Sequence, residues 1–428
     1  MGEINLPKIS WIQLATLFIC FLMNLLDGMD IMVISYAAPS LARELNLDPK
    51  NLGYVFSSGL LGMTLGALFL TTLADKLGRK FLIMVSAILM GIFVFATVWV
   101  HSFPELILMR FFSGIGIGSM LATTATMSSE YAPKESKTFW VSFVMSGYPV
   151  GAILTGLIAA PLIHLHGWQY IFLFAGCTTL VALPLIYFFL AESLEFLLKS
   201  RPKNALIKAN ILLQRMGKER LYQLPEPEAK EPPINLIGVL NTKGTVPTLL
   251  LWLSFFLSFA CLYFLTSWIP RLASISGMNS EWSIYSGTLF NLGAFFGILS
   301  LGYLSKYLGL KKSIFFFLVG NAALMLVFGL SRNPAWIMTL FGLIGFSIQG
   351  GFVGLYSVAS RMYPTQIRAT GMGWAVGAGR IGAILGPIFG GLLIDSGLSM
   401  QYNFIIFAIP TLLAGISTLF IQSIHLNS

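Results

Sequence analysis

The segment WIQLATLFICFLMNLLDGMDIMVISYAA (11–38) decides the fold class, because Asp27 and Asp30 are its only charged residues. A helix needs about 20 consecutive apolar residues to cross the hydrocarbon core of a bilayer, and this segment exceeds that length. Eleven more apolar runs of comparable length follow it, at 52–73, 81–100, 105–127, 139–163, 168–190, 246–269, 282–304, 313–331, 336–360, 370–394 and 402–424. The sequence therefore predicts an all-α membrane protein with twelve transmembrane helices.

The composition supports the same class. Of the 428 residues, 56% are hydrophobic and only 10% are charged, and the mean hydropathy is +0.81. A soluble protein of this length needs more charge to cover its surface, so most of this surface should face lipid. Cys20, Cys177 and Cys261 each stand alone in an apolar run, which predicts neither a disulfide framework nor a metal site. The first apolar run is longer than a signal peptide, so we expect no cleaved signal.

The net charge of +9 is distributed unevenly. If the connections alternate between the two sides of a membrane, 20 of the 26 Lys and Arg residues fall on the side of the N-terminus and only four on the other. Those four are Arg43, Lys50, Arg271 and Arg332. Basic residues concentrate on the cytoplasmic side of membrane proteins, so both termini are predicted to be cytoplasmic. The positive charge therefore reflects topology and does not indicate a nucleic-acid partner.

The first and second halves of the chain share sequence motifs at a constant offset of 231 residues. GAIL occurs at 151–154 and again at 382–385. Other pairs in this register are Gly62/Gly293, Gly66/Gly297, Leu77/Leu308, Gly78/Gly309, Lys80/Lys311, Gly114/Gly345 and Pro133/Pro364. A single register held across several spans indicates an internal duplication.

The duplication predicts two six-helix halves, residues 1–190 and 246–428. The polar stretch 191–245 between them is predicted to be a cytoplasmic linker that contains a short helix around 203–217. Two parallel six-helix repeats related by an axis along the membrane normal describe the major facilitator fold.

The loop after the second span, TTLADKLGRK (71–80), places one carboxylate among three cations in a short cytoplasmic turn. It resembles the signature loop of the major facilitator proteins, except that Thr71 replaces a leading glycine. Such a turn suits a gating latch that forms when the halves meet and breaks when they part. Anchoring of basic residues at the cytoplasmic surface is the alternative, but it does not explain the aspartate or the glycine. The predicted gating residues are Asp75, Lys76, Gly78, Arg79 and Lys80.

The first span contains two carboxylates in the sequence NLLDGMD. Asp27 and Asp30 are three residues apart and therefore share a helix face. Burial and mutual repulsion both favour a protonated carboxyl, so we expect the pair to bind a proton during transport. All four histidines lie at span ends or in loops and do not compete for this role. The alternative is that both aspartates only hold helices together.

The eleventh span contains Arg380 about ten residues from its start, or roughly 15 Å along a helix, which places it near the middle of the membrane. A guanidinium group there suits a substrate carboxylate, and neighbouring aromatic residues suit a ring. The alternative is that a buried aspartate across the interface neutralises Arg380. The predicted substrate-binding residues are Arg380, Trp374, Tyr356, Gln349 and Tyr148.

Two glycine-rich segments belong to the same half. Arg110 opens the fourth span and is followed by Gly114, Gly116 and Gly118. An arginine within a span is costly and normally faces a partner or a hydrated cavity. The fifth span contains GYPVGAILTG (147–156), whose small residues permit close packing and in which Pro149 could serve only as a kink.

Taken together, these segments resemble the aromatic acid:proton symporter family of the major facilitator superfamily, and the resemblance covers nearly the whole chain. The segments that carry it are DGMD (27–30), the 75–80 loop, Arg110 with its glycines, Glu130 in SSEYAP, GYPVGAIL (147–154), AESLEFL (191–197) and 363–387. Departures from the family pattern are Thr71, Lys76 and Ala191. The resemblance implies proton-coupled import of an aromatic or related carboxylate, such as a hydroxybenzoate, benzoate, protocatechuate or muconate, across a bacterial inner membrane.

In this interpretation Asp27 and Asp30 take the proton, while Arg110 and Glu130 support coupling. The partners are then a small organic anion, protons and lipid, and the protein is a monomer without a cofactor. Two rivals remain open: a transporter of the same fold for a sugar or a drug, and a membrane sensor. Arg380 argues against a cationic substrate, and the linker is too short for an obvious signalling domain. No metal cluster or nucleophile–base pair indicates an enzyme.

Overall fold

The structure, a computed structural model, describes residues 9–133, 136–225, 245–328, 333–363 and 367–421. Several residues used above lie outside these ranges. They are Arg332, residues 226–244 of the predicted linker, residues 329–331 and 422–424 at the ends of two predicted spans, and residues 364–366 of the segment 363–387, which include Pro364.

Twelve helices in the described part are long and apolar enough to cross a membrane, which confirms the predicted number. In the first half these are α1 (Trp11–Glu44), α2 (Pro49–Leu65), α4 (Arg79–Ala96), α5 (Phe103–Tyr131), α6 (Lys137–Met145) with α7 (Gly147–His166), and α8 (Gln169–Val181) with α9 (Leu183–Phe189). In the second half they are α13 (Thr245–Ile275), α14 (Ser280–Leu308), α15 (Leu310–Phe328), α16 (Pro334–Met362), α17 (Arg368–Asp395) and α18 (Met400–Phe420).

Shorter elements complete the first half and begin the linker. The second span continues beyond α2 through η1 (Gly66–Leu70) and η2 (Thr71–Leu73) into α3 (Ala74–Leu77). After the sixth span come α10 (Leu194–Ser200) and α11 (Ala205–Arg215), the latter within the range expected for a short helix.

The predicted fifth span is not one continuous helix. It is divided at Ser146 between α6 and α7, three residues before Pro149. A proline within a helix lacks the N–H that would bond to the carbonyl of the residue four positions earlier, here Met145. The break therefore lies where Pro149 removes that bond.

Packing contacts recur at the offset of 231 residues seen in the sequence. A Cβ atom added to Gly151 would overlap the carbonyl oxygen of Leu25, and one added to Gly382 would overlap that of Phe256. Each residue of the second pair lies 231 positions after its counterpart in the first. The helix pair α2–α5 of the first half and the pair α14–α16 of the second are likewise in close backbone contact through glycines. The two halves therefore use the same close helix crossings.

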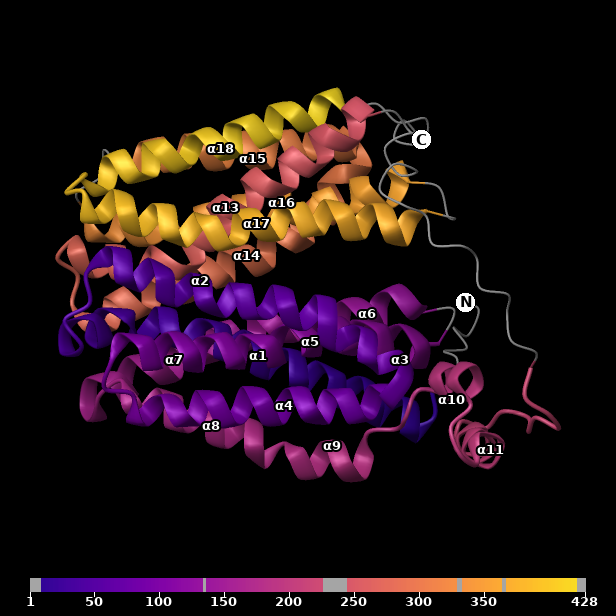
Figure 1. The fold of residues 1–428 in the computed structure, drawn as a ribbon. Helices are drawn as coiled ribbons and strands as arrows, with labels where there is room; N and C mark the ends of the chain where they lie inside the picture. The colour runs from indigo at the N-terminus through magenta and orange to yellow at the C-terminus, as the bar shows by residue number, and fades with distance from the viewer. Residues whose placement is uncertain (1–8, 134–135, 226–244, 329–332, 364–366, 422–428) are drawn as a thin grey trace, which may run out of the picture.

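Figure 1 shows the halves as two layers, indigo to magenta and orange to yellow, with α10 and α11 at one end of the bundle. We call this end the linker end. Near the opposite end, Ser35 of α1 donates hydrogen bonds to the carbonyl oxygens of Thr266 (2.8 Å) and Ser267 (2.9 Å) of α13. Ser57 of α2 donates to the carbonyl of Ile384 of α17 at 2.6 Å. We call these contacts between the halves the opposite-end seam.

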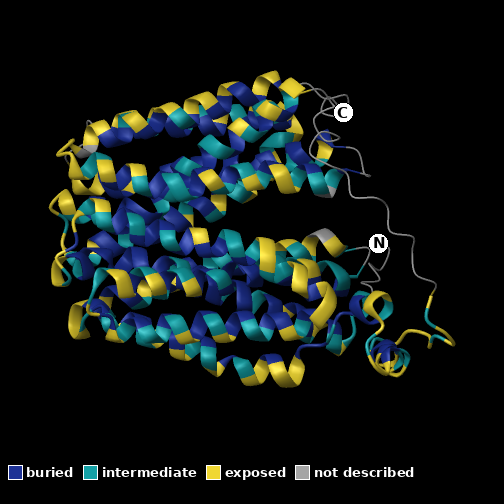
Figure 2. Ribbon diagram, in the orientation of Figure 1, coloured by how far each residue is buried: buried dark blue, intermediate teal, exposed yellow. Residues whose placement is uncertain are grey.

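Burial follows the expected environment. Buried residues lie between the helices, whereas exposed residues mark the outward faces of the bundle (Figure 2). Many of the exposed side chains are large and apolar; the exposed fraction is 67% for Phe69 and 73% for Phe188. Such faces suit contact with lipid tails, because lipid tails are as apolar as the side chains of a neighbouring helix.

Candidate transport site

Asp27 and Asp30 lie on one face of α1 in the interior of the first half, with exposed fractions of 0% and 1%. Arg110 of α5 approaches only the second of them. Its Nη1 lies 3.7 Å from Oδ1 of Asp30, and its Nη2 donates to the backbone carbonyl of Asp30 at 3.2 Å. Among the described residues Asp27 has no ion-pair partner, and neither of its oxygens has a hydrogen bond. The pair therefore consists of one compensated and one uncompensated carboxyl.

Gly28, between the two aspartates, brings α7 into contact with α1. A Cβ atom at this position would overlap the backbone carbonyl of Tyr148. The close approach carries Tyr148 to the face of α1 that bears Asp27, and the two side chains interact electrostatically. The small residue in DGMD thus positions an aromatic residue from another helix.

Arg380 of α17 faces the same region from the second half. Its guanidinium carbon lies 5.8 Å from the ring centroid of Phe259 of α13, within the range of a cation–π contact. Its Nη1 is buried and has no hydrogen-bond partner. The charge of Arg380 acts on the hydroxyl groups of Tyr148 and Tyr356. Arg380 therefore presents an unsatisfied donor where residues of both halves meet.

The surroundings of Arg380 are aromatic. Phe259 stacks on Tyr263, with ring centroids 5.8 Å apart, and meets Phe352 edge-on at 4.7 Å. Tyr356 packs edge-on against Phe255 at 5.1 Å. We call these five residues of α13 and α16 the aromatic wall. Gly379 makes room for it, because a Cβ atom there would overlap Phe259.

Sequence reasoning missed Phe352 of α16 and the three members of the aromatic wall on α13, which are Phe255, Phe259 and Tyr263. Their spacing of four residues along the seventh span places them on one helix face, and this was the available signal. An aromatic stripe in an apolar span is more often ordinary packing. Only the contact between Phe259 and Arg380 singles it out.

The predicted substrate residues are not all brought together. Gln349 lies seven residues before Tyr356, on the same face of α16, and its buried Oε1 has no hydrogen-bond partner. Trp374 instead stacks on Trp252 with centroids 6.1 Å apart, and 45% of its surface is exposed. It lies six residues, about 9 Å, before Arg380 and on a different face of α17. Trp374 is therefore separate from the aromatic wall.

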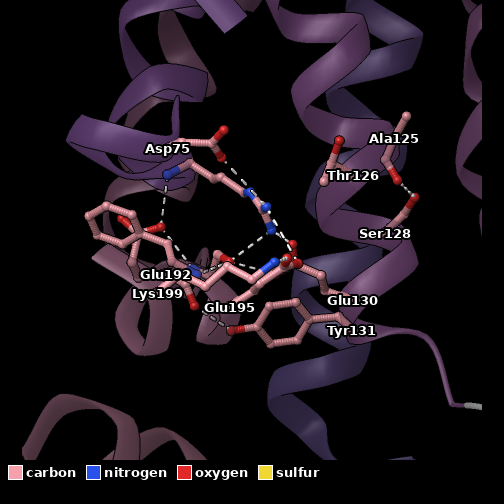
Figure 3. Close-up of polar contacts among 12 residues, drawn as sticks. Asp75, Ala125, Thr126, Ser128, Glu130, Tyr131, Glu192, Glu195 and Lys199 are labelled. Atoms are coloured by element: carbon pink, nitrogen blue, oxygen red, sulfur yellow. Dashed lines mark hydrogen bonds and ion pairs between the residues drawn. The ribbon is translucent and has the colours of Figure 1, made fainter. Parts of the chain in front are cut away.

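The predicted gating loop forms a cluster with the linker (Figure 3). Gly78 has a φ of 102°, a backbone conformation that favours glycine, and it immediately precedes α4. The buried Arg79 forms ion pairs with Glu130, with Glu195 at 3.5 Å and with Asp75 at 3.9 Å. We call the set Asp75, Arg79, Glu130, Glu192, Ser193 and Glu195 the Arg79 cluster.

Glu192 and Ser193 attach the linker to α4. One carboxylate oxygen of Glu192 accepts hydrogen bonds from the backbone N–H groups of Arg79 (2.9 Å) and Lys80 (3.1 Å). Arg79 also donates to the hydroxyl of Ser193 at 2.9 Å. A hydrogen bond from Lys199 and the charge of Arg79 hold the pKa of the Glu195 carboxyl below its usual range. All members of the Arg79 cluster belong to the first half or to the linker.

Glu130 is not brought to the carboxyls of α1. It lies 20 residues after Arg110 on α5, or about 30 Å along the helix, in the Arg79 cluster. Its negative charge therefore compensates a cation at the linker end.

The described ranges contain no group of three or more His, Cys, Asp or Glu residues that could hold a metal ion. The three cysteines are free; Cys20 and Cys261 are buried and Cys177 is exposed.

A model of the Major Facilitator Superfamily matches residues 20–300 and 283–425. The chain belongs to this superfamily. It is 31% identical to the 4-hydroxybenzoate transporter PcaK of Pseudomonas aeruginosa over 96% of this chain and 93% of that protein. It is 30% identical to the benzoate transport protein of Acinetobacter baylyi, over 98% and 91% respectively. The predicted resemblance to aromatic acid transporters of the major facilitator superfamily is thereby confirmed.

Solved structures agree on the fold. A D-xylose–proton symporter superposes with a TM-score of 0.74 at 19% identity, covering 96% of this chain and 97% of that one. The twelve-helix major facilitator fold predicted from the duplication is therefore confirmed, and the chain is a multi-pass membrane protein of a transporter family.

Proposed function

We propose that this protein is a secondary active transporter that imports an aromatic or related small organic carboxylate together with protons. The observation that carries the proposal is Arg380, a cation with an unsatisfied donor that lies over the aromatic wall where the two halves meet.

The substrate class follows from these two chemistries. A guanidinium group binds a carboxylate through two parallel hydrogen bonds, which a point charge cannot reproduce. Aromatic side chains favour edge-on or offset contacts with a ring. Several relatives of this chain are named for the transport of 4-hydroxybenzoate, gallate or benzoate, each an aromatic carboxylate. In this proposal Arg380 binds the carboxylate and Tyr148, Tyr356 and Gln349 contact the ring or its substituents.

Proton coupling is assigned to Asp27 and Asp30. Both carboxyls are buried, and only Asp30 has a cation beside it. A proton on either residue lowers the negative charge near the entering anion, which allows the halves to close around the substrate. Tyr148 connects the proposed proton site with the proposed anion site, because it interacts electrostatically with both Asp27 and Arg380.

Gating is assigned to Asp75, Lys76, Gly78, Arg79 and Lys80. Asp75 contributes its backbone carbonyl to a hydrogen bond with Ser200 and an ion pair at 3.9 Å to Arg79, but 82% of its side chain remains exposed. This carboxylate is therefore accessible to the second half when the linker ends of the halves approach. The rest of the Arg79 cluster ties α10 to the first half, so the two should move together.

The proposed location is the bacterial inner membrane, with both termini and the linker in the cytoplasm. The uneven distribution of Lys and Arg supports this orientation. The linker end is then cytoplasmic and the opposite-end seam lies on the periplasmic side.

A panel of labelled substrates tests the proposal in proteoliposomes. We expect accumulation of benzoate-like anions when the outside is more acidic than the inside, and none without a gradient. Competition by unlabelled benzoates but not by sugars or cationic drugs would support the assignment. Accumulation of a sugar or a drug would instead favour that rival, and binding without transport would favour a sensor.

A further inference from the structure

A small cavity of about 30 Å³ lies between α1, α2, α5 and α13, beside Arg110 and next to the opposite-end seam. Its polar lining comes from Arg110 and Ser35 of the first half and from Tyr263, Thr266 and Ser267 of the second. A cavity needs roughly 10–15 Å³ and two to four polar partners to hold a water molecule. This one meets both requirements.

Arg110 supplies an independent reason for a ligand in this cavity. Only 3% of the residue is exposed, and its Nη1 has no hydrogen-bond partner. The distance of 3.7 Å from Nη1 to Asp30 allows electrostatic attraction but is too long for a hydrogen bond. A buried charged donor left in this way is costly unless water or another group satisfies it.

We propose that the cavity holds one ordered water molecule, which hydrogen-bonds to Arg110 and to the seam formed by Ser35, Thr266 and Ser267. The inference deepens the proposed function, on which its role in coupling rests. When Asp30 takes up a proton from solution, it loses the charge that attracts Arg110. The water then remains as a partner of Arg110 and changes only its hydrogen bonds.

The position of this water links the proton site to the contact between the halves. The hydroxyl of Ser35 donates to both α13 carbonyls. The carbonyl oxygen of Thr266 receives no helical hydrogen bond, because Pro270 four residues later lacks an N–H, so it retains a lone pair for a water donor. The other ionisable side chains around Asp30, Arg110 and the cavity are Asp27, Tyr36, Tyr148, Tyr263 and Arg380. Among the described residues only Asp30 forms an ion pair with Arg110, so its protonation is the event to which the water must respond.

Radiolytic footprinting of the full-length protein in detergent tests the presence of the water. An X-ray pulse converts a bound water into a hydroxyl radical, which removes one electron from the sulfur of an adjacent methionine. Dissolved oxygen then completes the oxidation to the sulfoxide. Met32 and Met63 line the cavity although each is only 2% exposed. Met90 and Met127 are fully buried and do not line it, so they are the controls. We expect labelling of the first pair to exceed that of the controls at least severalfold. Equal labelling of all four would overturn the proposal.

Gly59→Ala tests the role of the water in coupling. Gly59 lines the cavity, and the nearest neighbour of a Cβ atom there is the carbonyl oxygen of Arg110 at 3.5 Å, so the methyl group fits and takes up space. Gly342→Ala on α16 is the matched control, because its closest contact is 3.6 Å and it lies outside the cavity lining.

For Gly59→Ala we expect weaker labelling of Met32 and Met63 and about tenfold slower uptake driven by a proton gradient, the loss expected when a hydrogen bond to a charged group is removed. Exchange of substrate without a gradient should stay within about twofold of wild type. Unchanged gradient-driven uptake despite lost labelling would remove the coupling role. If the wild-type protein shows no gradient-driven uptake, the proposed function fails while the footprinting result still decides whether the water is present.

Discussion

The two halves share a scaffold but differ in chemistry at equivalent positions. In the register of 231 residues, Asp27 corresponds to Ser258 and Asp30 to Cys261, while Arg110 corresponds to Phe341. The buried ionic group of the first half is thus replaced in the second by small polar and aromatic side chains. The comparison indicates that the proposed proton site and the proposed anion site arose on opposite copies of one six-helix unit.

The packing between the first and fifth helices of each half differs in the same way. In the first half the small residue Gly28 is on the first helix and the aromatic Tyr148 on the fifth. In the second half the order is reversed, since Phe259 is on the first helix and Gly379 on the fifth. Gly28 meets the backbone of Tyr148, whereas Gly379 meets the ring of Phe259, which lies beneath the neighbouring Arg380.

The largest expected effect comes from removing the acids that distinguish the first half. Asp27→Asn or Asp30→Asn should abolish accumulation driven by a pH gradient, because an amide cannot take up the proton. At least one of the two variants should still exchange substrate, since the proposed anion site is on the second half. Ser258→Ala and Cys261→Ser, at the equivalent positions, are the controls and should retain coupling. Gradient-driven accumulation by both Asn variants would mean that these aspartates are not the coupling site.

Replacing the planar guanidinium of Arg380 tests the proposed anion site of the second half. Arg380→Lys keeps the charge but loses the planar pair of donors, so it should weaken substrate binding at least about tenfold, nearly as much as Arg380→Ala. Arg361→Lys, at an exposed position of α16, is the control. Equilibrium binding and uptake of benzoate measure the effect. Near-normal affinity of the Lys variant would show that Arg380 serves only as a counter-charge.

The loops at the linker end differ as well, because Lys306 occupies the position equivalent to Asp75. Asp75→Asn should slow transport severalfold while leaving substrate affinity mostly intact, since the loop lies far from Arg380. Lys306→Asn should have a smaller effect if only the first loop acts as a latch. Turnover measured at saturating substrate, with binding measured separately, distinguishes the two. Normal turnover in the Asp75 variant would exclude the gating role.

The smallest predicted effect concerns the aromatic wall. Phe259→Leu removes the ring beneath Arg380 and should weaken substrate binding about threefold, as expected for one partly solvated cation–π contact. Phe264→Leu is a matched control on the same helix, because Phe264 stacks on Phe407, at 3.7 Å between centroids. Equal effects of the two substitutions would indicate loss of packing and not of a specific contact with Arg380.

Much of the fold could be predicted because hydrophobic length and repetition are properties of the sequence itself. Twelve apolar runs gave the number of spans, and the recurrence of GAIL and the glycine pairs identified the duplication. The ends of the helices were harder to predict from the sequence. The apolar run 11–38 stops before α1 does, because the helix continues through Pro39 to Glu44, past the last residue of the apolar run.

The candidate site could be predicted from the sequence only in part. Asp27, Asp30, Arg110 and Arg380 attract attention because charge in a membrane span is costly. Sequence alone does not show which charge faces which, so it could not predict that Arg110 approaches Asp30 and leaves Asp27 without a cation. It also grouped Glu130 with the coupling residues, although that carboxylate pairs with Arg79 in a separate cluster. Contacts between distant spans depend on helix rotation, which apolar runs do not specify.

The contact between Ser35 and Thr266 has a consequence for the ancestry of the molecule. These residues are 231 positions apart, so each contacts the residue at the equivalent position of the other half. In a symmetric homodimer, a residue contacts its own copy only on the twofold axis. The hydroxyl of Ser35 therefore marks where that axis passed if the ancestor was a pair of separate six-helix chains. In the present single chain the two residues need no longer be identical, and the asymmetry of serine and threonine at this point is one record of their divergence.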